Sequence, residues 1–108
     1  MWLVCDGEVL ATAELAATRR ERARGLLGRR GYEGALVFRR VRQVHTVGMR
    51  FSIDVAFCDR QGRVLRMVTM RPWRVSRVVW KSALVIEAEA GAFERWGLRV
   101  GDHVEVKD

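Results

Sequence analysis

The sequence predicts a mainly β domain, either an antiparallel sandwich or a partly open barrel of about seven or eight short strands with one amphipathic helix packed on it. Large apolar side chains alternate with polar or small ones along several short runs, as in half-buried strands. Asp and Gly turn signals separate these runs, and a clear helical pattern occurs only once. An α+β fold is the alternative.

The chain is predicted to open with a β-hairpin and to continue with a helix. Asp6-Gly7 separates the apolar runs WLVC and EVLA, and Asp-Gly favours the type I′ turn that matches strand twist. Thr18 and Glu21 then have capping-box spacing, in which each side chain accepts from the other's free backbone N–H. We expect a helix from Arg19 to Leu27 that packs one apolar stripe on the sheet.

Further strands follow, and short turns connect them. The sequence DRQG (59–62) has Asp first and Gly last, as type I turns prefer, and predicts a hairpin. A short helical turn is expected between Gly91 and Gly97, and a turn at Gly101 leads into the last strand. The predicted strands are 35–38, 44–47, 51–58, 63–70, 83–90 and 103–106.

The strand predicted at 51–58 contains a carboxylate. Phe51, Ile53, Val55 and Phe57 share one face, so Asp54 lies on the other. Within a half-buried strand a carboxylate must be paired or hydrogen-bonded, because an isolated buried charge costs several kcal/mol.

Length and composition indicate one domain over residues 1–108, since 49% of the side chains are apolar. No apolar run is long enough to span a membrane and the N-terminus lacks a signal-peptide pattern, so we expect a cytoplasmic protein. The net charge of +7 comes almost wholly from arginine, since Lys81 and Lys107 are the two lysines. The arginines are dispersed through the chain. This favours a preference of the source genome for arginine over a surface dedicated to binding polyanions.

Three segments together resemble domain of unknown function family 192. They are TRRERARGLLGRRGYEGALVF, HTVGMRFSIDVAFCDRQGRVL and LVIEAEAGAFERWGLRVGDHVEV, in the family's order and over nearly the whole chain. Leu27 replaces the family's usual Met. The usual central motif is Trp-Met-Lys-Asn-Thr followed after two residues by Pro-Leu-Asp, and only Asp54 is unchanged here, with Gly48 and Met49 at the Asn and Thr positions.

The resemblance implies a jelly-roll-like β fold with a packed helix, and it implies no established activity. Many members of the family carry an export signal or a lipid anchor, and we expect this sequence to depart from that pattern. The resemblance also selects Glu87, which matches a family position, and Arg22, which matches the N-terminal pattern and is a candidate ion-pair partner for Asp54. A turn backbone is the other candidate partner.

Four polar residues form the candidate ligand site. His45, Thr46, Asp54 and Glu87 are predicted to line one polar pocket where two short strands meet at Gly48, a bulge or kink. The structural alternatives are Asp54 as a buried anchor, Glu87 as an Arg-paired surface carboxylate and His45 as a space-filling aromatic. Two isolated cysteines and two isolated histidines provide no metal-binding spacing, so we expect neither a metal nor a cofactor.

The segment 70–82, MRPWRVSRVVWKS, interleaves arginine with tryptophan. Such a segment supplies charge and stacking for single-stranded nucleic acid, although weak, charge-driven binding is expected. The alternative is that the tryptophans cap the sheet and the arginines are solvated. The candidate polyanion contacts are Arg71, Trp73, Arg74, Arg77, Trp80 and Lys81.

The leading functional hypothesis is a non-catalytic binding module for a small polar ligand, a glycan or a protein partner. No nucleophile–base pair in the sequence demands catalysis. The alternatives are an acid–base hydrolase that uses Asp54 and Glu87, and polyanion binding by the segment 70–82.

Overall fold

A computed structural model of the chain describes residues 1–16 and 34–108. The mainly β prediction is confirmed, with one short helix in this part of the chain. The helix predicted for 19–27 lies outside the described residues. In chain order the elements are β1 (Trp2–Cys5), β2 (Glu8–Leu15), β3 (Ala35–Arg39), β4 (Ile53–Cys58), β5 (Val64–Met70), β6 (Leu84–Glu89), α2 (Ala92–Trp96) and β7 (Val104–Lys107).

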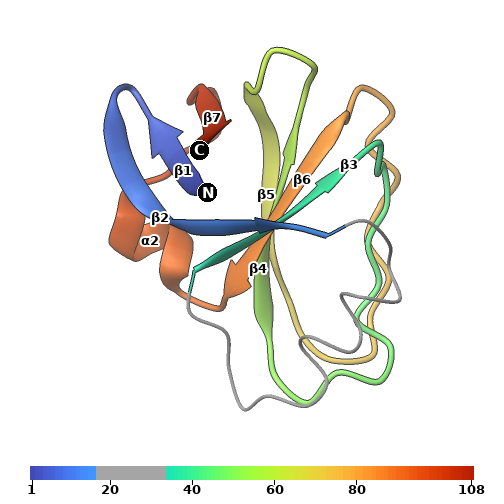
Figure 1. Cartoon of the computed structure of the whole chain (residues 1–108). Helices are drawn as coiled ribbons and strands as arrows, with labels where there is room; N and C mark the ends of the chain where they lie inside the picture. The colour runs from blue at the N-terminus through green and yellow to red at the C-terminus, as the bar shows by residue number, and fades with distance from the viewer. Residues whose placement is uncertain (17–33) are drawn as a thin grey trace.

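The strands form one seven-stranded sheet in the order β5-β4-β6-β3-β2-β1-β7 (Figure 1). The sheet curves so far that its two edges meet at one end. An isolated bridge joins Arg63, just before β5, to His103, just before β7, and the Val64 N–H donates to the Asp102 carbonyl at 2.8 Å. Of the two architectures expected, this sheet corresponds to the partly open barrel.

The expectation of a wholly antiparallel sheet is wrong at one position. β2 and β3 pair in parallel, with Ala13 opposite Ala35 and Leu15 opposite Val37. Parallel neighbours need a long crossover connection, and the chain between Leu15 and Ala35 is long enough to provide one. Every other pair of neighbouring strands is antiparallel.

The strand predicted at 44–47 is also wrong. This segment is part of a loop, in which His45 forms an isolated bridge with Val75. The loop then turns sharply, as the Met49 N–H donates to the Thr46 carbonyl at 3.1 Å with Gly48 at φ 84°. Gly48 therefore occupies the position of a tight turn that requires positive φ, and no strand continues through it.

Three turns predicted from short sequences are confirmed. Asp6 and Gly7 both have positive φ, 50° and 81°, as a type I′ turn between β1 and β2 requires. In the β4–β5 hairpin the Gly62 N–H donates to the Asp59 carbonyl at 3.0 Å. α2 ends at Gly97, which has φ 71°.

Both faces of the central strands β3, β4 and β6 are buried, each against a different part of the chain. The alternation predicted for β4 holds, since Ile53, Val55 and Phe57 contact one apolar cluster and Ala56 and Cys58 the other. The first cluster is completed by the loop residues Val44 and Met49, and the second by α2 and β7. Figure 1 shows α2 on one side of the molecule and the segments 40–52 and 70–82 running together on the opposite side. In the described residues, no helix is long and apolar enough to cross a bilayer.

Candidate functional site

Asp54 is buried on the α2 side of the sheet, where its carboxylate accepts three hydrogen bonds. Oδ2 accepts from the backbone N–H groups of Gly91 at 3.0 Å and Phe93 at 3.2 Å. Oδ1 accepts from the hydroxyl of Thr69 on β5 at 2.7 Å. Gly91 precedes α2 and has no side chain to cap the helix, so Asp54 satisfies these N–H groups from the neighbouring strand. Arg22, the other candidate partner, lies outside the described residues.

Glu87 is also buried, but on the opposite face of the sheet from Asp54. On β6 it lies directly across from Val55 and Leu36, whereas Asp54 lies across from Ala88. Cross-strand partners share a face and successive residues alternate, so the two carboxyl groups point to opposite sides. Glu87 is 1% exposed and shares its face with an apolar cluster. Acid–base catalysis by a carboxylate pair needs both groups in one cleft, and this geometry gives it no support.

Thr46 is buried and joins the segments 41–47 and 71–82. Its hydroxyl donates to the Arg71 carbonyl at 2.6 Å and accepts from the Arg74 N–H at 2.9 Å. Its backbone N–H donates to the Arg74 carbonyl at 2.8 Å, and its own carbonyl accepts from the Trp73 N–H at 2.9 Å. Thr46 therefore determines the backbone path of the loop that carries Arg71, Trp73 and Arg74.

His45 lies beside Thr46 and is half-buried. Its Nδ1 accepts from the Val47 N–H at 3.3 Å, and its backbone bridges to Val75. The structure thus brings His45 and Thr46 together with the 71–75 loop. It does not bring them into one pocket with Asp54 and Glu87, which lie on opposite faces of the sheet.

Further hydrogen bonds hold the two segments together along their length. Val44 and Ser76 exchange two of them: the Val44 N–H donates to the Ser76 hydroxyl at 2.9 Å, and the Ser76 N–H donates to the Val44 carbonyl at 2.8 Å. The Ser82 hydroxyl donates to the Val41 carbonyl at 2.7 Å. The Arg and Trp segment is therefore a bonded loop with a defined shape.

Four arginines line one groove along the outer edge of β5, and we call it the arginine groove. Arg66 comes from β5, and Arg71, Arg74 and Arg77 come from the loop that follows it. The groove encloses about 410 Å³ and no carboxylate lines it. β5 is an edge strand of the sheet, so the groove lies beside an open edge.

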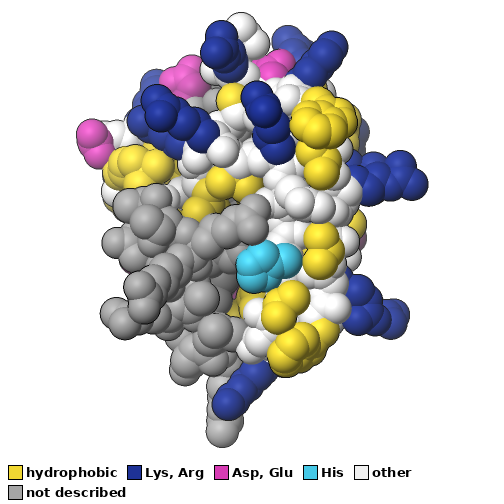
Figure 2. Space-filling model, turned by 90° about the vertical axis from the view of Figure 1, so that its right-hand side faces the viewer, with side chains coloured by type: hydrophobic (Ala, Val, Ile, Leu, Met, Phe, Trp, Pro, Cys, Tyr) yellow, Lys and Arg dark blue, Asp and Glu magenta, His cyan; other side chains and the backbone are white. Residues whose placement is uncertain are grey.

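Two tryptophans of the same loop are solvent-exposed. Trp73 is 65% exposed and Trp80 is 74% exposed, so neither caps the sheet as one hypothesis held. Trp73 also has φ 62°, a conformation uncommon for a residue with a bulky side chain. Figure 2 shows hydrophobic side chains scattered over this side of the molecule, with Lys and Arg around them. Lys81 is exposed but does not line the groove.

The described residues contain no cluster of three or more His, Cys, Asp and Glu that could hold a metal ion. Cys5 and Cys58 are free thiols. Cys58 is buried, and desolvation, aided by the charge of Asp59, raises its pKa to about 12. A thiol in that environment is inert at neutral pH.

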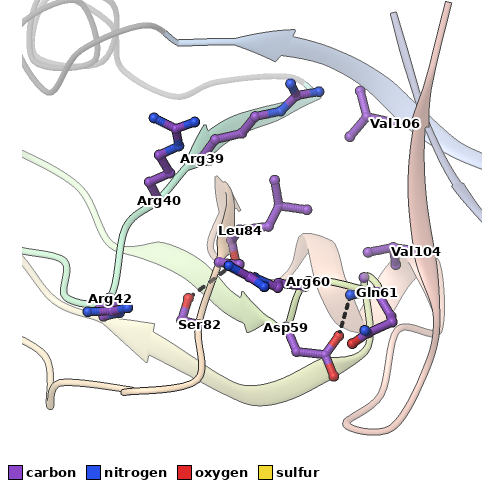
Figure 3. A pocket seen from close by; sticks show the side chains of 12 residues that line it. Arg39, Arg40, Arg42, Asp59, Arg60, Gln61, Ser82, Leu84, Val104 and Val106 are labelled. Carbon is purple, nitrogen blue, oxygen red and sulfur yellow. Dashed lines mark hydrogen bonds between the residues drawn. The ribbon is translucent and has the colours of Figure 1, made fainter.

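A second basic pocket, which the sequence analysis missed, lies at the end of the curved sheet near the β4–β5 turn. It encloses about 850 Å³. Figure 3 shows Arg39, Arg40 and Arg42 on the β3 side, Val104 and Val106 on the β7 side, and Arg60 between them. The run RRVR at 39–42 was a visible signal, but its convergence with Arg60 depends on the fold.

The DUF192 family model, described as "Uncharacterized ACR, COG1430", matches residues 3–106. The chain belongs to this family. Two UPF0127 proteins are similar over 62 residues: PYRAB11210 of Pyrococcus abyssi, at 37% identity, and PF1050 of Pyrococcus furiosus, at 31%. Each alignment covers 57% of this DUF192 chain and 53% of the relative, so the chain spans about half the length of the curated relatives it matches.

Two solved structures resemble this DUF192 chain. A "putative transcription regulator" from Sinorhizobium meliloti 1021 is 26% identical with a TM-score of 0.74, covering 96% of this chain and 89% of that one. A protein of unknown function from Novosphingobium aromaticivorans is 24% identical with a TM-score of 0.72, covering 87% of this chain and 74% of that one. The second likeness concerns the fold alone.

The family motif also explains part of the site. Asp54, the one position of the central DUF192 motif that is unchanged here, holds the start of α2. Gly48 and Met49 occupy the positions of the family's usual Asn and Thr, and they form a turn and part of the apolar core. This DUF192 chain therefore has no polar side chain at either position.

Proposed function

We propose that this DUF192 domain is a non-catalytic binding domain whose arginine groove takes single-stranded nucleic acid. The observation that carries the proposal is the convergence of Arg66, Arg71, Arg74 and Arg77 on one groove at the edge of β5. Arg71, Arg74 and Arg77 were candidate polyanion contacts from the sequence, and Arg66 of β5 lines the same groove. Gathered in one groove without a carboxylate, the four are much stronger evidence for a polyanion surface than the sequence alone provides.

Arginine is well suited to phosphate, because its planar guanidinium group donates several hydrogen bonds in a fixed arrangement and stays charged at neutral pH. In the described part of the chain, no ion pair links these four arginines to an acidic side chain. Their guanidinium charges are therefore available to an external anion. A groove that follows a backbone of phosphates needs this kind of lining.

The exposed aromatic side chains favour nucleic acid over other polyanions. Trp73 lies in the loop between the groove arginines Arg71 and Arg74 and is 65% exposed. Its carbonyl accepts from Arg74 Nη1 at 3.4 Å, and Thr46 holds its backbone. A tryptophan presented next to guanidinium groups offers a stacking surface for an unpaired base. The Sinorhizobium meliloti neighbour, described as a putative transcription regulator, is consistent with a nucleic-acid ligand.

The other functional hypotheses have less support. The small-ligand site needed His45, Thr46, Asp54 and Glu87 around one pocket, and the hydrolase needed the two carboxylates in one cleft. Asp54 and Thr46 instead make hydrogen bonds that hold α2 and the 71–74 loop.

Fluorescence anisotropy with a labelled single-stranded oligonucleotide of about 15 nucleotides tests the proposal, with a salt titration between about 50 and 200 mM. Arg71→Gln and Arg77→Gln should each lower the slope of log affinity against log salt by about 0.7, the value for one lost phosphate contact in a single strand. Arg99→Gln removes the same charge outside both basic pockets and is the matched control.

Trp73→Ala should weaken binding by about 5- to 150-fold, equivalent to about 1–3 kcal/mol, and should leave the salt slope unchanged. Equal effects of Arg71→Gln and Arg99→Gln would show that only net charge matters and would refute the groove. Competition by polyglutamate as effective as that by unlabelled oligonucleotide would refute the nucleic-acid assignment.

A further inference from the structure

The pocket near the β4–β5 turn, here called the end pocket, is a second site that shares no residue with the arginine groove. It lies at the end of the curved sheet where the two edges meet. The end of β3, the β4–β5 turn, the residues leading into β6 and the strand β7 surround it. We propose that the end pocket binds a small organic phosphate whose apolar part rests on Leu84 and Val106.

The rim of the end pocket is strongly basic. Arg39, Arg40, Arg42 and Arg60 contribute four positive charges, and Asp59 contributes one negative charge. Asp59 is already engaged, since its Oδ1 accepts from the backbone N–H groups of Gln61 and Arg63, both at 2.9 Å. In the described part of the chain, none of the four arginines forms an ion pair. Their mutual repulsion is relieved when an anion binds among them.

The backbone conformation at Arg40 supports the assignment of a binding site here. Arg40 has φ 60°, a left-handed conformation that costs an L-residue free energy, and its N–H donates to the Ala83 carbonyl at 2.9 Å. Arg39 is the last residue of β3 and pairs with Leu84. The left-handed residue turns the chain directly after β3, so the arginines on either side of the turn line the same pocket (Figure 3).

The apolar residues of the pocket indicate the nature of the rest of the ligand, beyond its phosphate group. Leu84 and Val106 are half-buried, so they expose apolar surface in the pocket, whereas Val104 is buried. A pocket with an apolar floor and a few charged groups at its rim suits a small molecule with an apolar body and one anionic group. Four guanidinium groups favour a phosphate monoester, which carries up to two negative charges, over a singly charged carboxylate.

The probes are phenyl phosphate, inorganic phosphate, benzoate and phenol, each titrated into the full chain by isothermal calorimetry. Phenyl phosphate should bind more tightly than the other three, because it alone combines the dianion with the apolar ring. Arg60→Gln and Arg39→Gln should each raise its Kd tenfold or more. Val106→Ser should weaken phenyl phosphate and leave inorganic phosphate unchanged.

Arg77→Gln, in the arginine groove, is the matched control and should leave phenyl phosphate binding unchanged. Arg60→Gln should in turn leave oligonucleotide binding unchanged, so the two proposals fail or stand separately. Equal binding of phenol and phenyl phosphate would overturn the proposal, as would an Arg77→Gln effect as large as that of Arg60→Gln. Absence of binding by folded protein at millimolar phenyl phosphate would overturn it as well.

Discussion

Asp54 illustrates, at the scale of one residue, how a buried charge is accommodated. Its two oxygens accept from a hydroxyl and two backbone N–H groups, so the carboxylate keeps hydrogen bonds in place of water. The sequence analysis considered two partners for Asp54, Arg22 and a turn backbone. Among the described residues, the turn backbone is the partner. Asp54 joins β4, β5 and α2 at a single point.

We predict that Asp54→Ala destabilises the fold by about 2 to 4 kcal/mol, because it leaves two buried N–H groups at the start of α2 without an acceptor. Asp54→Asn should cost less, since an amide oxygen still accepts from them. Chemical denaturation monitored by circular dichroism measures both free energies. Thr69→Val, which removes one donor to the carboxylate, is the control and should cost about 1 kcal/mol. An Asp54→Ala variant as stable as the parent protein would rule out the anchor.

At the scale of elements, the pairing of the segments 41–47 and 71–82 matters most. The segment that contains Val44 and Thr46 was predicted as a strand. Instead, Val44 covers one face of the sheet, and both residues bond to the 71–76 loop. In the proposed function Thr46 acts indirectly, because its hydroxyl holds the backbone of Arg71 and Arg74.

We predict that Thr46→Val, which is nearly isosteric, destabilises the protein by about 1 to 3 kcal/mol, since it leaves the Arg71 carbonyl and the Arg74 N–H without their partner. It should also weaken oligonucleotide binding, because the arginines of the groove lose their fixed positions. Denaturation and anisotropy on the same sample measure the two effects. Thr46→Ser keeps the hydroxyl and should retain most of the binding. If Thr46→Val bound as well as Thr46→Ser, the hydroxyl would have no role in shaping the groove.

At the scale of the whole molecule, the two edges of the sheet meet beside the β4–β5 turn. Gly62, at φ 86°, donates to Asp59, and its carbonyl accepts from the Val104 N–H at 2.9 Å. A Cβ at this position would collide with the Val104 carbonyl oxygen. The curvature of the sheet therefore depends on a backbone contact that only glycine permits.

We predict that Gly62→Ala is markedly more destabilising than Gly7→Ala, and thermal denaturation of the two variants measures the difference. Both residues have positive φ, so both substitutions should cost about 1 to 2 kcal/mol in backbone strain. Gly62→Ala should cost about 1 to 3 kcal/mol more, because β7 must move away. At Gly7 a Cβ meets no atom within 4 Å. Equal costs would mean that the contact between the sheet edges is loose.

The sequence by itself determined the local features of this protein. The turns at Asp6-Gly7 and at Asp59–Gly62, and the alternation of faces along β4, depend on neighbouring residues and on backbone preferences that short stretches encode. The need for a partner at Asp54 was equally evident, because desolvation of a carboxylate is costly wherever it is buried.

Only the tertiary structure decided which of these residues meet. Strand register sets Asp54 and Glu87 on opposite faces, and the parallel pairing of β2 with β3 follows from a long crossover. In the end pocket, Arg60 of the β4–β5 turn meets the arginines at 39–42, which are distant in the sequence. Such contacts arise from burial of apolar surface between distant segments, which no local pattern records. The end pocket therefore emerged only with the fold, whereas Arg71, Arg74 and Arg77 of the arginine groove were already candidate polyanion contacts from the sequence.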